Sequence, residues 1–246
     1  MNEILTLTSA VFYEDREPEI RSEKFRALMD LCFAHAERFS LHRENWPGAN
    51  DGALEQALRP FCLGEYRSYA AIYVSKKKKF WQKCYLYPAT EETKAILLRY
   101  IPHLFGREPD PAPEGHKAYF QKKYAAYEQA REAAAERIME YIDRMGRDLD
   151  RQTFAAFEKE AFREADAIWR RTFDPKDCYS TMDDPCFFRG DEIFFETITH
   201  EQECFVHVIS DEFGAKLREL GEWADVSDRF CLPLFSLKKA KDLVLY

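Results

Sequence analysis

A long helix-forming stretch, residues 117–171, separates two strand-rich parts of this chain. Residues 117–145 are rich in Ala, Glu, Lys and Arg, which favour helices. In residues 150–171, apolar side chains recur at helical spacing, and this spacing predicts a second amphipathic helix. The segment 106–116 contains three prolines and is predicted to be a linker.

The two strand-rich parts share the order helix, hairpin, helix. The first predicts a helix over residues 19–41, a β-hairpin over 65–75 and 80–87, and a helix capped by Thr90. The second predicts a turn at Asp183-Asp184-Pro185, a hairpin over 193–198 and 204–209, and a helix over 211–223 capped by Ser210. The whole pattern is typical of an α+β protein.

A short signature recurs just before each predicted hairpin. Residues 61–65 and 187–191 both have the form Phe-x-x-Gly-acid. The shared order and this signature predict two helix–hairpin–helix halves that arose by duplication, joined by the proline-rich linker and two long helices. The segments are then 1–105 (N-terminal half), 106–116 (linker), 117–172 (helical segment) and 173–246 (C-terminal half), in one compact domain or more.

Composition excludes several broad classes of protein. Of the 246 residues, 46% are hydrophobic, which is enough apolar surface to offset the entropy of ordering the chain. Lys and Arg total 36 against 44 Asp and Glu, a net charge of -8. Such a chain repels nucleic acid and anionic membranes at long range and favours basic partners.

The sequence predicts a soluble protein of the cytoplasm that uses no cofactor. There is no apolar run long enough to span a membrane, and the first residues do not form a secretory signal. The seven cysteines are odd in number, widely spaced and without a C-x-x-C pair, as expected for reduced thiols. With nine glycines and no Walker or dinucleotide motif, a phosphate-binding loop is not expected.

One motif, His200-Glu201-Gln202-Glu203-Cys204, has the residue types of a catalytic or metal site. It resembles the start of a zinc-protease helix, with Cys204 in place of the second histidine. The flanking residues are strand formers, so we predict a hairpin turn and no metal site. His200, Glu201 and Cys204 nevertheless are the first candidates if the chain is a hydrolase or transferase with a dispersed site.

The predicted helix 117–145 carries an acidic stripe. Its members recur every fourth residue: Glu128, Glu132, Glu136 and Glu140. A carboxylate-bridged metal pair needs Glu-x-x-His on partner helices, and this sequence does not occur in the chain. The stripe is therefore a solvated face, or a docking surface for a basic protein.

The first predicted hairpin combines tyrosines with a lysine run. Four tyrosines alternate along its strands and are candidates for one aromatic binding face: Tyr69, Tyr73, Tyr85 and Tyr87. Lys76–Lys79 lies between the strands. Lysines beside aromatic residues bind single-stranded nucleic acid, but the chain is net acidic and the run falls where a hairpin turn is expected, so we favour a solvated turn.

The absence of catalytic motifs, the acidic stripe and the aromatic strands favour a non-enzymatic protein that binds another protein. An acidic inhibitor or immunity-type partner of a basic effector is the specific form of this hypothesis. The alternatives are the dispersed-site hydrolase or transferase, and weak nucleic-acid binding through Lys76–Lys79.

Overall fold

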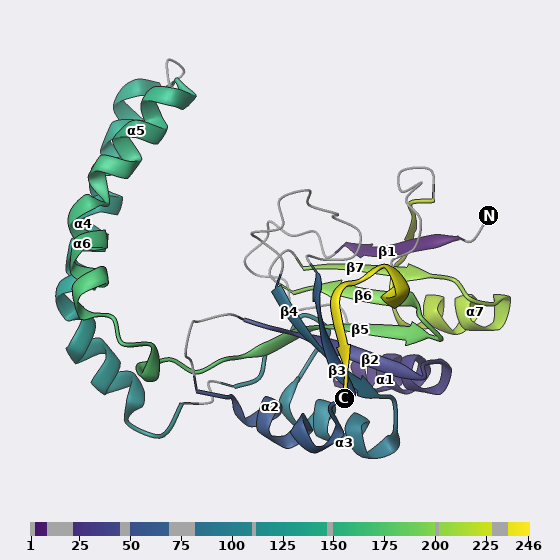
Figure 1. Cartoon of the computed structure of the whole chain (residues 1–246). Helices are drawn as coiled ribbons and strands as arrows, with labels where there is room; N and C mark the ends of the chain where they lie inside the picture. The colour runs from purple at the N-terminus through teal and green to yellow at the C-terminus, as the bar shows by residue number, and fades with distance from the viewer. Residues whose placement is uncertain are drawn as a thin grey trace. The chain divides into compact units, whose positions relative to one another are not determined.

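The structure is a computed structural model that forms two compact units, unit 1 (Met1–Pro111 with Tyr179–Tyr246) and unit 2 (Ala112–Cys178). Figure 1 shows a β-sheet with helices in unit 1, and helices alone in unit 2. The described residues are 3–8, 22–44, 50–68, 82–109, 112–146, 150–199, 202–227 and 236–246.

Unit 1 is built on one sheet. Its strands are β1 (Ile4–Thr8), β2 (Arg38–Arg43), β3 (Gly64–Ser68), β4 (Gln82–Pro88), β5 (Met182–Arg189), β6 (Glu192–Ile198), β7 (Glu203–His207), β8 (Ala224–Asp225) and β9 (Lys241–Leu245). Its helices are α1 (Ser22–His35), α2 (Ala53–Leu58), α3 (Glu91–Tyr100) and α7 (Asp211–Leu220), with the 3-10 turns η1 (Arg59–Phe61) and η5 (Leu237–Lys239). The nine strands lie in the order β8-β1-β7-β6-β5-β2-β4-β3-β9, and all pairings are antiparallel.

The prediction of two helix–hairpin–helix halves is wrong, because a single nine-stranded sheet contains both hairpins. Strand β2 pairs with β4 on one side and β5 on the other, and so joins the two hairpins. The duplication also fails on strand order. In the first hairpin β2 adjoins the second strand, β4, whereas in the second hairpin β5 adjoins the first strand, β6.

The predicted helix over residues 19–41 is too long, and this error hid strand β2. Helix α1 ends at His35, and β2 begins three residues later. Phe39 and Leu41 are fully buried in the main core, while Ser40 contacts Tyr66. Phe39 fits both the helical spacing of the preceding residues and the alternation of a strand, so periodicity alone cannot separate the two structures here.

The predicted turn at Asp183-Asp184-Pro185 is in fact part of β5. The pairing of β5 with β2 shifts register between Ser40 and His42, which marks a β-bulge. Asp184 occupies this bulge with a positive φ of 51°. A turn-like sequence thus lies within a strand, because the bulge accommodates one residue more in β5 than in the paired stretch of β2.

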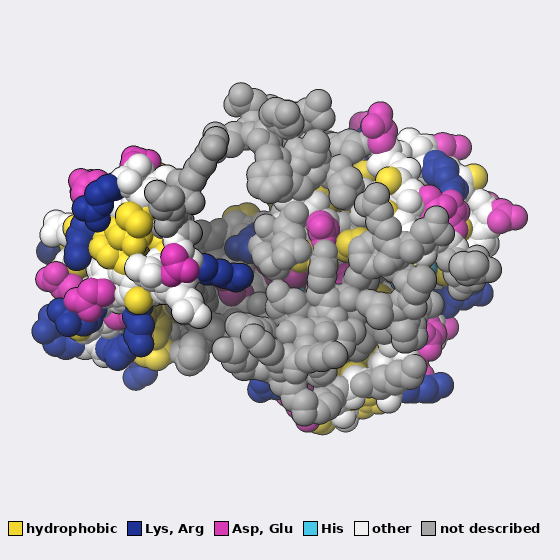
Figure 2. Space-filling model, turned by 90° about the horizontal axis from the view of Figure 1, so that it is seen from above, with side chains coloured by type: hydrophobic (Ala, Val, Ile, Leu, Met, Phe, Trp, Pro, Cys, Tyr) yellow, Lys and Arg dark blue, Asp and Glu magenta, His cyan; other side chains and the backbone are white. Residues whose placement is uncertain are grey.

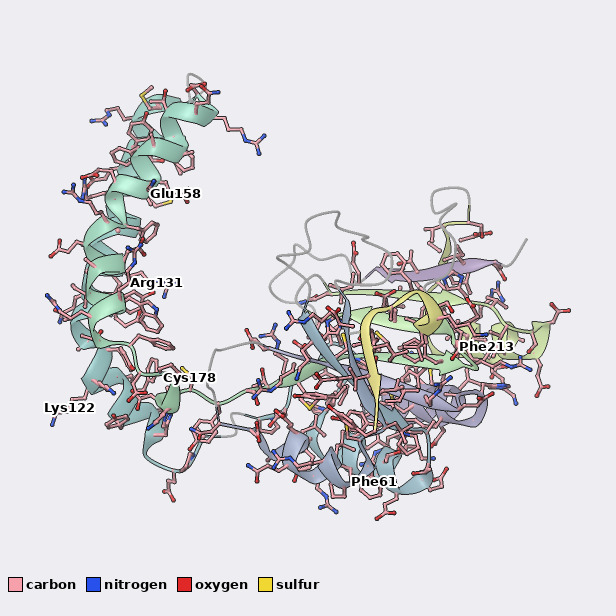
Figure 3. All side chains as sticks on the ribbon, viewed as in Figure 1. Phe61, Lys122, Arg131, Glu158, Cys178 and Phe213 are labelled. Atoms are coloured by element: carbon pink, nitrogen blue, oxygen red, sulfur yellow. The ribbon has the colours of Figure 1, made fainter. Side chains whose placement is uncertain are left out.

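The helices of unit 1 lie on one face of the sheet (Figure 1). The main core forms between this face and α1, α2, α3 and α7, and it includes Phe39, Phe187 and Phe195. Phe213 of α7 is fully buried, with its ring 5.7 Å from that of Phe194, and Figure 3 shows it near the sheet. A smaller apolar cluster occupies the opposite face, where Leu237 of η5 joins it.

Two predicted helix caps are confirmed. The Thr90 hydroxyl accepts a hydrogen bond from the Thr93 amide at the start of α3. The Ser210 hydroxyl accepts one from the Phe213 amide at the start of α7. Both caps satisfy backbone donors that a helix start otherwise leaves without a partner.

Unit 2 is a helical hairpin. It comprises α4 (His116–Met145), α5 (Arg151–Ala161), α6 (Arg163–Thr172) and the turn η4 (Pro175–Asp177). Helix α4 packs along α5 and α6 through a small apolar cluster and stacked aromatic rings. The ring centres of Tyr141 and Phe157 lie 4.1 Å apart. Asp177 ties η4 to α4, because its carboxylate accepts a 2.7 Å hydrogen bond from the Tyr124 hydroxyl.

Candidate functional site

A pocket of about 330 Å³ lies in unit 1 where β3, β4 and β9 meet α2 and η1. Its volume is at the lower end of the range for small-ligand sites. Three tyrosines, two glutamates, an arginine and a cysteine line it: Tyr85, Tyr87, Tyr246, Glu55, Glu65, Arg59 and Cys62. Below we refer to these seven residues as the tyrosine pocket.

The close approach of β9 to β3 builds one wall of the tyrosine pocket. A Cβ atom on Gly64 would lie 2.2 Å from the Val244 carbonyl oxygen, so only glycine allows β9 to pair here. Beyond β9, the Tyr246 amide donates to the Leu63 carbonyl at 2.9 Å. Its hydroxyl donates to Glu65 Oε2 at 3.0 Å, which fixes the ring beside the glutamate.

The chain's own lysine shows how this region binds a cation. Lys83 Nζ lies 2.6 Å from Glu65 Oε2 and 5.2 Å from the centre of the Tyr85 ring. Although burial alone raises the pKa of Glu65, its hydrogen bonds with Lys83 and Tyr246 lower it overall. The carboxylate is therefore ionised at neutral pH, and Glu65 and Tyr85 together hold an ammonium group.

The other polar groups of the tyrosine pocket are also held in place. Glu55 is buried, and its Oε2 accepts hydrogen bonds from Arg43 Nε at 2.9 Å and from the Ser180 hydroxyl at 2.7 Å. Arg59 pairs with Asp51. These contacts fix the side chains in position before any ligand arrives, which lowers the entropic cost of binding.

Beside the pocket, β9 is an edge strand of the sheet and carries exposed apolar side chains. Val244 is 50% exposed, Leu245 59% and Tyr246 75%. In the part of the chain that the structure describes, no strand pairs with the outer side of β9. An uncovered edge strand offers backbone donors and acceptors to another chain.

A second group of polar residues, the acid–imidazole cluster, lies in unit 1. It consists of His42, Asp183 and Asp184, which are buried in the sheet, and Arg107, whose side chain is 45% exposed. His42 Nδ1 lies 3.1 Å from Asp184 Oδ2, and the Thr199 amide donates to Asp184 Oδ1 at 2.6 Å. Arg107 Nε lies 3.1 Å from Asp183 Oδ2. The bulge at Asp184 brings both aspartates close to His42.

The two aspartates of the acid–imidazole cluster differ in pKa. Burial and the negative charge of Asp184 raise the pKa of Asp183 to about 7. Burial also acts to raise the pKa of Asp184, but its contacts with His42 and the Thr199 amide lower it overall. Burial lowers the pKa of His42, but Cys84 and Asp184 outweigh this effect, so the pKa is raised. Divergent pKa values of this kind occur in acid–base catalysis and in buried structural networks.

Burial favours a structural role for the acid–imidazole cluster. The His42 and Asp184 side chains are each only 6% exposed, and that of Asp183 is 9% exposed. A substrate would need to reach these groups, whereas a structural network needs only internal partners. The cluster joins β2 and β5 to the segment that carries Arg107, and we interpret it as a pH-sensitive element of the fold.

The residues of the His-Glu-x-x-Cys motif do not form a described site. Cys204 lies in β7, fully buried in the main core, and burial raises the pKa of its thiol well above the ordinary value. Such a thiol is a poor nucleophile. His200 and Glu201 lie outside the described residues.

Two of the four candidate tyrosines lie in the tyrosine pocket. Tyr85 and Tyr87 stand two residues apart on β4 and both line the pocket. Tyr69 and Tyr73 lie outside the described residues, as does the run Lys76–Lys79. No sequence pattern indicates Glu55, Glu65 and Tyr246 as partners of these tyrosines, because strand register decides which residues meet.

The acidic stripe lies on α4 of unit 2. Glu132, Glu136 and Glu140 are exposed, and Glu128 lies 3.5 Å from Arg131. Residues 112–178 hold fourteen acidic and thirteen basic residues, so the unit as a whole is nearly neutral. Figure 2 shows both signs of charge interspersed over this unit, and Figure 3 labels Arg131 and Glu158 on it. The stripe is one row on a mixed surface.

Two kinds of feature are absent from the described residues, a cluster of metal ligands and a helix able to span a membrane. No group of three His, Cys, Asp or Glu side chains there is placed to hold a metal ion. None of the helices described is both long and apolar enough to cross a membrane.

Comparison of the chain with protein-family models, with curated proteins and with solved structures found no match. The function must therefore be inferred from the residues and their geometry. The tyrosine pocket opens to solvent, whereas His42, Asp183 and Asp184 of the acid–imidazole cluster are buried.

Proposed function

We propose that this chain is a non-enzymatic binding protein, and that it holds an extended segment of a partner protein along β9. One observation carries the proposal: three consecutive exposed apolar residues, Val244, Leu245 and Tyr246, lie at the edge of the sheet beside a pocket. In strand addition, main-chain hydrogen bonds supply affinity and side-chain pockets supply specificity.

The proposed partner is a basic protein. Since unit 2 is nearly neutral, most of the net charge of -8 lies in residues 1–111 and 179–246, which hold thirty acidic and twenty-three basic residues. This excess supports electrostatic steering of a basic partner toward unit 1, with an association rate that falls as salt rises. The inhibitor or immunity-type role is proposed on the same ground.

Site-specific crosslinking tests this proposal. A photoreactive amino acid replaces Val244 in one variant and Lys216, which is exposed on α7, in a matched control. Each protein is mixed with lysate of its source cells at low and at high salt. We expect an adduct with another protein from position 244 only, at low salt only, and none when Leu245→Asp is added. Equal adducts from both positions would refute the proposal, and so would an adduct with a second copy of this chain or no adduct.

A cytoplasmic location and the absence of a cofactor are part of the same proposal. The cytoplasmic location is supported by the seven cysteines, which are odd in number, widely spaced and without a C-x-x-C pair. The hydrolase or transferase alternative has less support, because the Cys204 thiol is buried among apolar side chains. Nucleic-acid binding through Lys76–Lys79 stays a prediction from the sequence.

A further inference from the structure

We propose that the tyrosine pocket binds an ammonium group, and specifically the lysine side chain of the segment that pairs with β9. This inference rests on the proposed function for the source of the ammonium group. The chemistry of the pocket itself stands on separate observations, which concern its lining residues and the chain's own Lys83.

The first observation is the composition of the lining. Tyrosine rings present a negative face, which attracts an ammonium group that lies close to it. The lining combines three tyrosines with Glu55 and Glu65, against the single cation Arg59, which already pairs with Asp51. Glu55 also pairs with Arg43, and Glu65 with Lys83, so an incoming ammonium group would share each carboxylate with one cation of the chain and gain the tyrosine faces in addition.

The second observation is the position of Lys83, whose ammonium group acts as an internal example. It contacts Glu65 at 2.6 Å and lies 5.2 Å from the centre of the Tyr85 ring. Both residues also line the pocket, where Tyr246 contributes a further ring bonded to the same carboxylate. An incoming lysine would therefore use the acceptor and ring types that already bind Lys83.

The third observation concerns a second cavity among the described residues, which is less suited to an ammonium group. That cavity, of about 400 Å³, lies between α1 and α3 and is lined by charged and aliphatic side chains, without an aromatic ring. Its acids Asp30 and Glu91 both contact Lys94, at 2.7 and 2.8 Å. An ammonium group would gain no aromatic contact there.

A matched pair of small probes tests the pocket without any partner protein. Choline carries a quaternary ammonium, and 3,3-dimethylbutan-1-ol is its neutral isostere. Chemical shifts of labelled protein are followed while each probe is added to the full chain. We expect choline to shift resonances of the tyrosine pocket and to bind at least tenfold more tightly than the isostere. Equal affinity of the two probes, or no binding of choline, would overturn the proposal.

Variants locate the binding and control for folding. Tyr85→Leu is expected to weaken choline binding about tenfold and Glu65→Gln about fivefold, while Tyr119→Leu, on an exposed residue of unit 2, leaves it unchanged. Each variant is first checked by thermal unfolding. Equal losses in all three variants would refute the site.

Choline binding tests the ammonium site, and crosslinking at position 244 tests the proposed function, so the two proposals can fail separately. If choline binds but position 244 forms no adduct, the pocket takes an ammonium ligand that does not come from a strand partner. If position 244 forms its adduct but choline does not bind, the edge strand binds protein and the ammonium inference is wrong.

Discussion

Replacing Asp183 with asparagine should change how the stability of unit 1 depends on pH. The folded state raises the pKa of this carboxyl group from its ordinary 3.8 to about 7, through burial and the charge of Asp184. Between these two values the folded chain keeps a proton that the unfolded chain has lost. Stability therefore falls as pH rises through this window, because the folded state binds more protons.

The size of the effect follows from the two pKa values. A change from 3.8 to about 7 corresponds to about 4 kcal/mol in the free energy of unfolding, lost progressively between about pH 4 and pH 8. The charges of Arg107 and His42 act to lower the pKa of Asp183, but burial and the charge of Asp184 outweigh them. Asparagine resembles the protonated acid and does not titrate, so the variant does not have this loss.

Urea unfolding of both proteins at pH 5 and pH 8 is the assay, with Glu219→Gln on the exposed side of α7 as a control. At pH 5 we expect the wild type to have lost about 2 kcal/mol relative to Asp183→Asn, because the carboxyl group of the unfolded chain already titrates near 3.8. At pH 8 the variant should be more stable, by up to about 4 kcal/mol. A difference that stays constant with pH, or a variant that is less stable at pH 8, would show that the Arg107 pair keeps Asp183 ionised and would refute the reasoning.

Three further changes test other parts of the structure. Gly64→Ala places a methyl group against the Val244 carbonyl and separates β9 from β3. The variant should have a free energy of unfolding in urea that is lower by about 1–3 kcal/mol, and its residues 241–246 should be cleaved faster by proteases. Burial lowers the pKa of His207 to about 4, so the folded chain loses stability as pH falls below 6.5, where the unfolded chain takes up a proton. His207→Gln should remove up to about 3 kcal/mol of that loss. Parallel curves of unfolding free energy against pH for the two proteins would contradict this. Ser210→Ala removes the cap of α7 and should lower stability by about 1 kcal/mol, whereas no change would show that water replaces the hydroxyl.

Much of the secondary structure could be predicted from the sequence, because helices and hairpins are encoded locally. The helix now seen as α4 and the hairpin β6–β7 both follow from spacing and turn residues. The caps Thr90 and Ser210 follow from residue type and position. In each case the interactions that decide the structure lie within a few residues along the chain.

The single sheet could not be predicted in the same way. It depends on β2, whose six residues also fit the apolar spacing of the preceding helix. It also depends on pairings between strands that are far apart in sequence, such as β1 with β7. The tyrosine pocket depends on these long-range pairings too. The alternation of tyrosines predicts that Tyr85 lies in an aromatic strand, but its proximity to Tyr246 is set by the register of β9 on β3.

Hydrogen–deuterium exchange of the complex tests the central proposal, that a partner pairs with the edge of the sheet. The amide protons of residues 243–245 are compared in the free chain and in the salt-sensitive complex captured at low salt. The proposal predicts slower exchange of these amides in the complex, together with slower exchange in the neighbouring β3. Protection confined to unit 2, or unchanged exchange along β9, would contradict it.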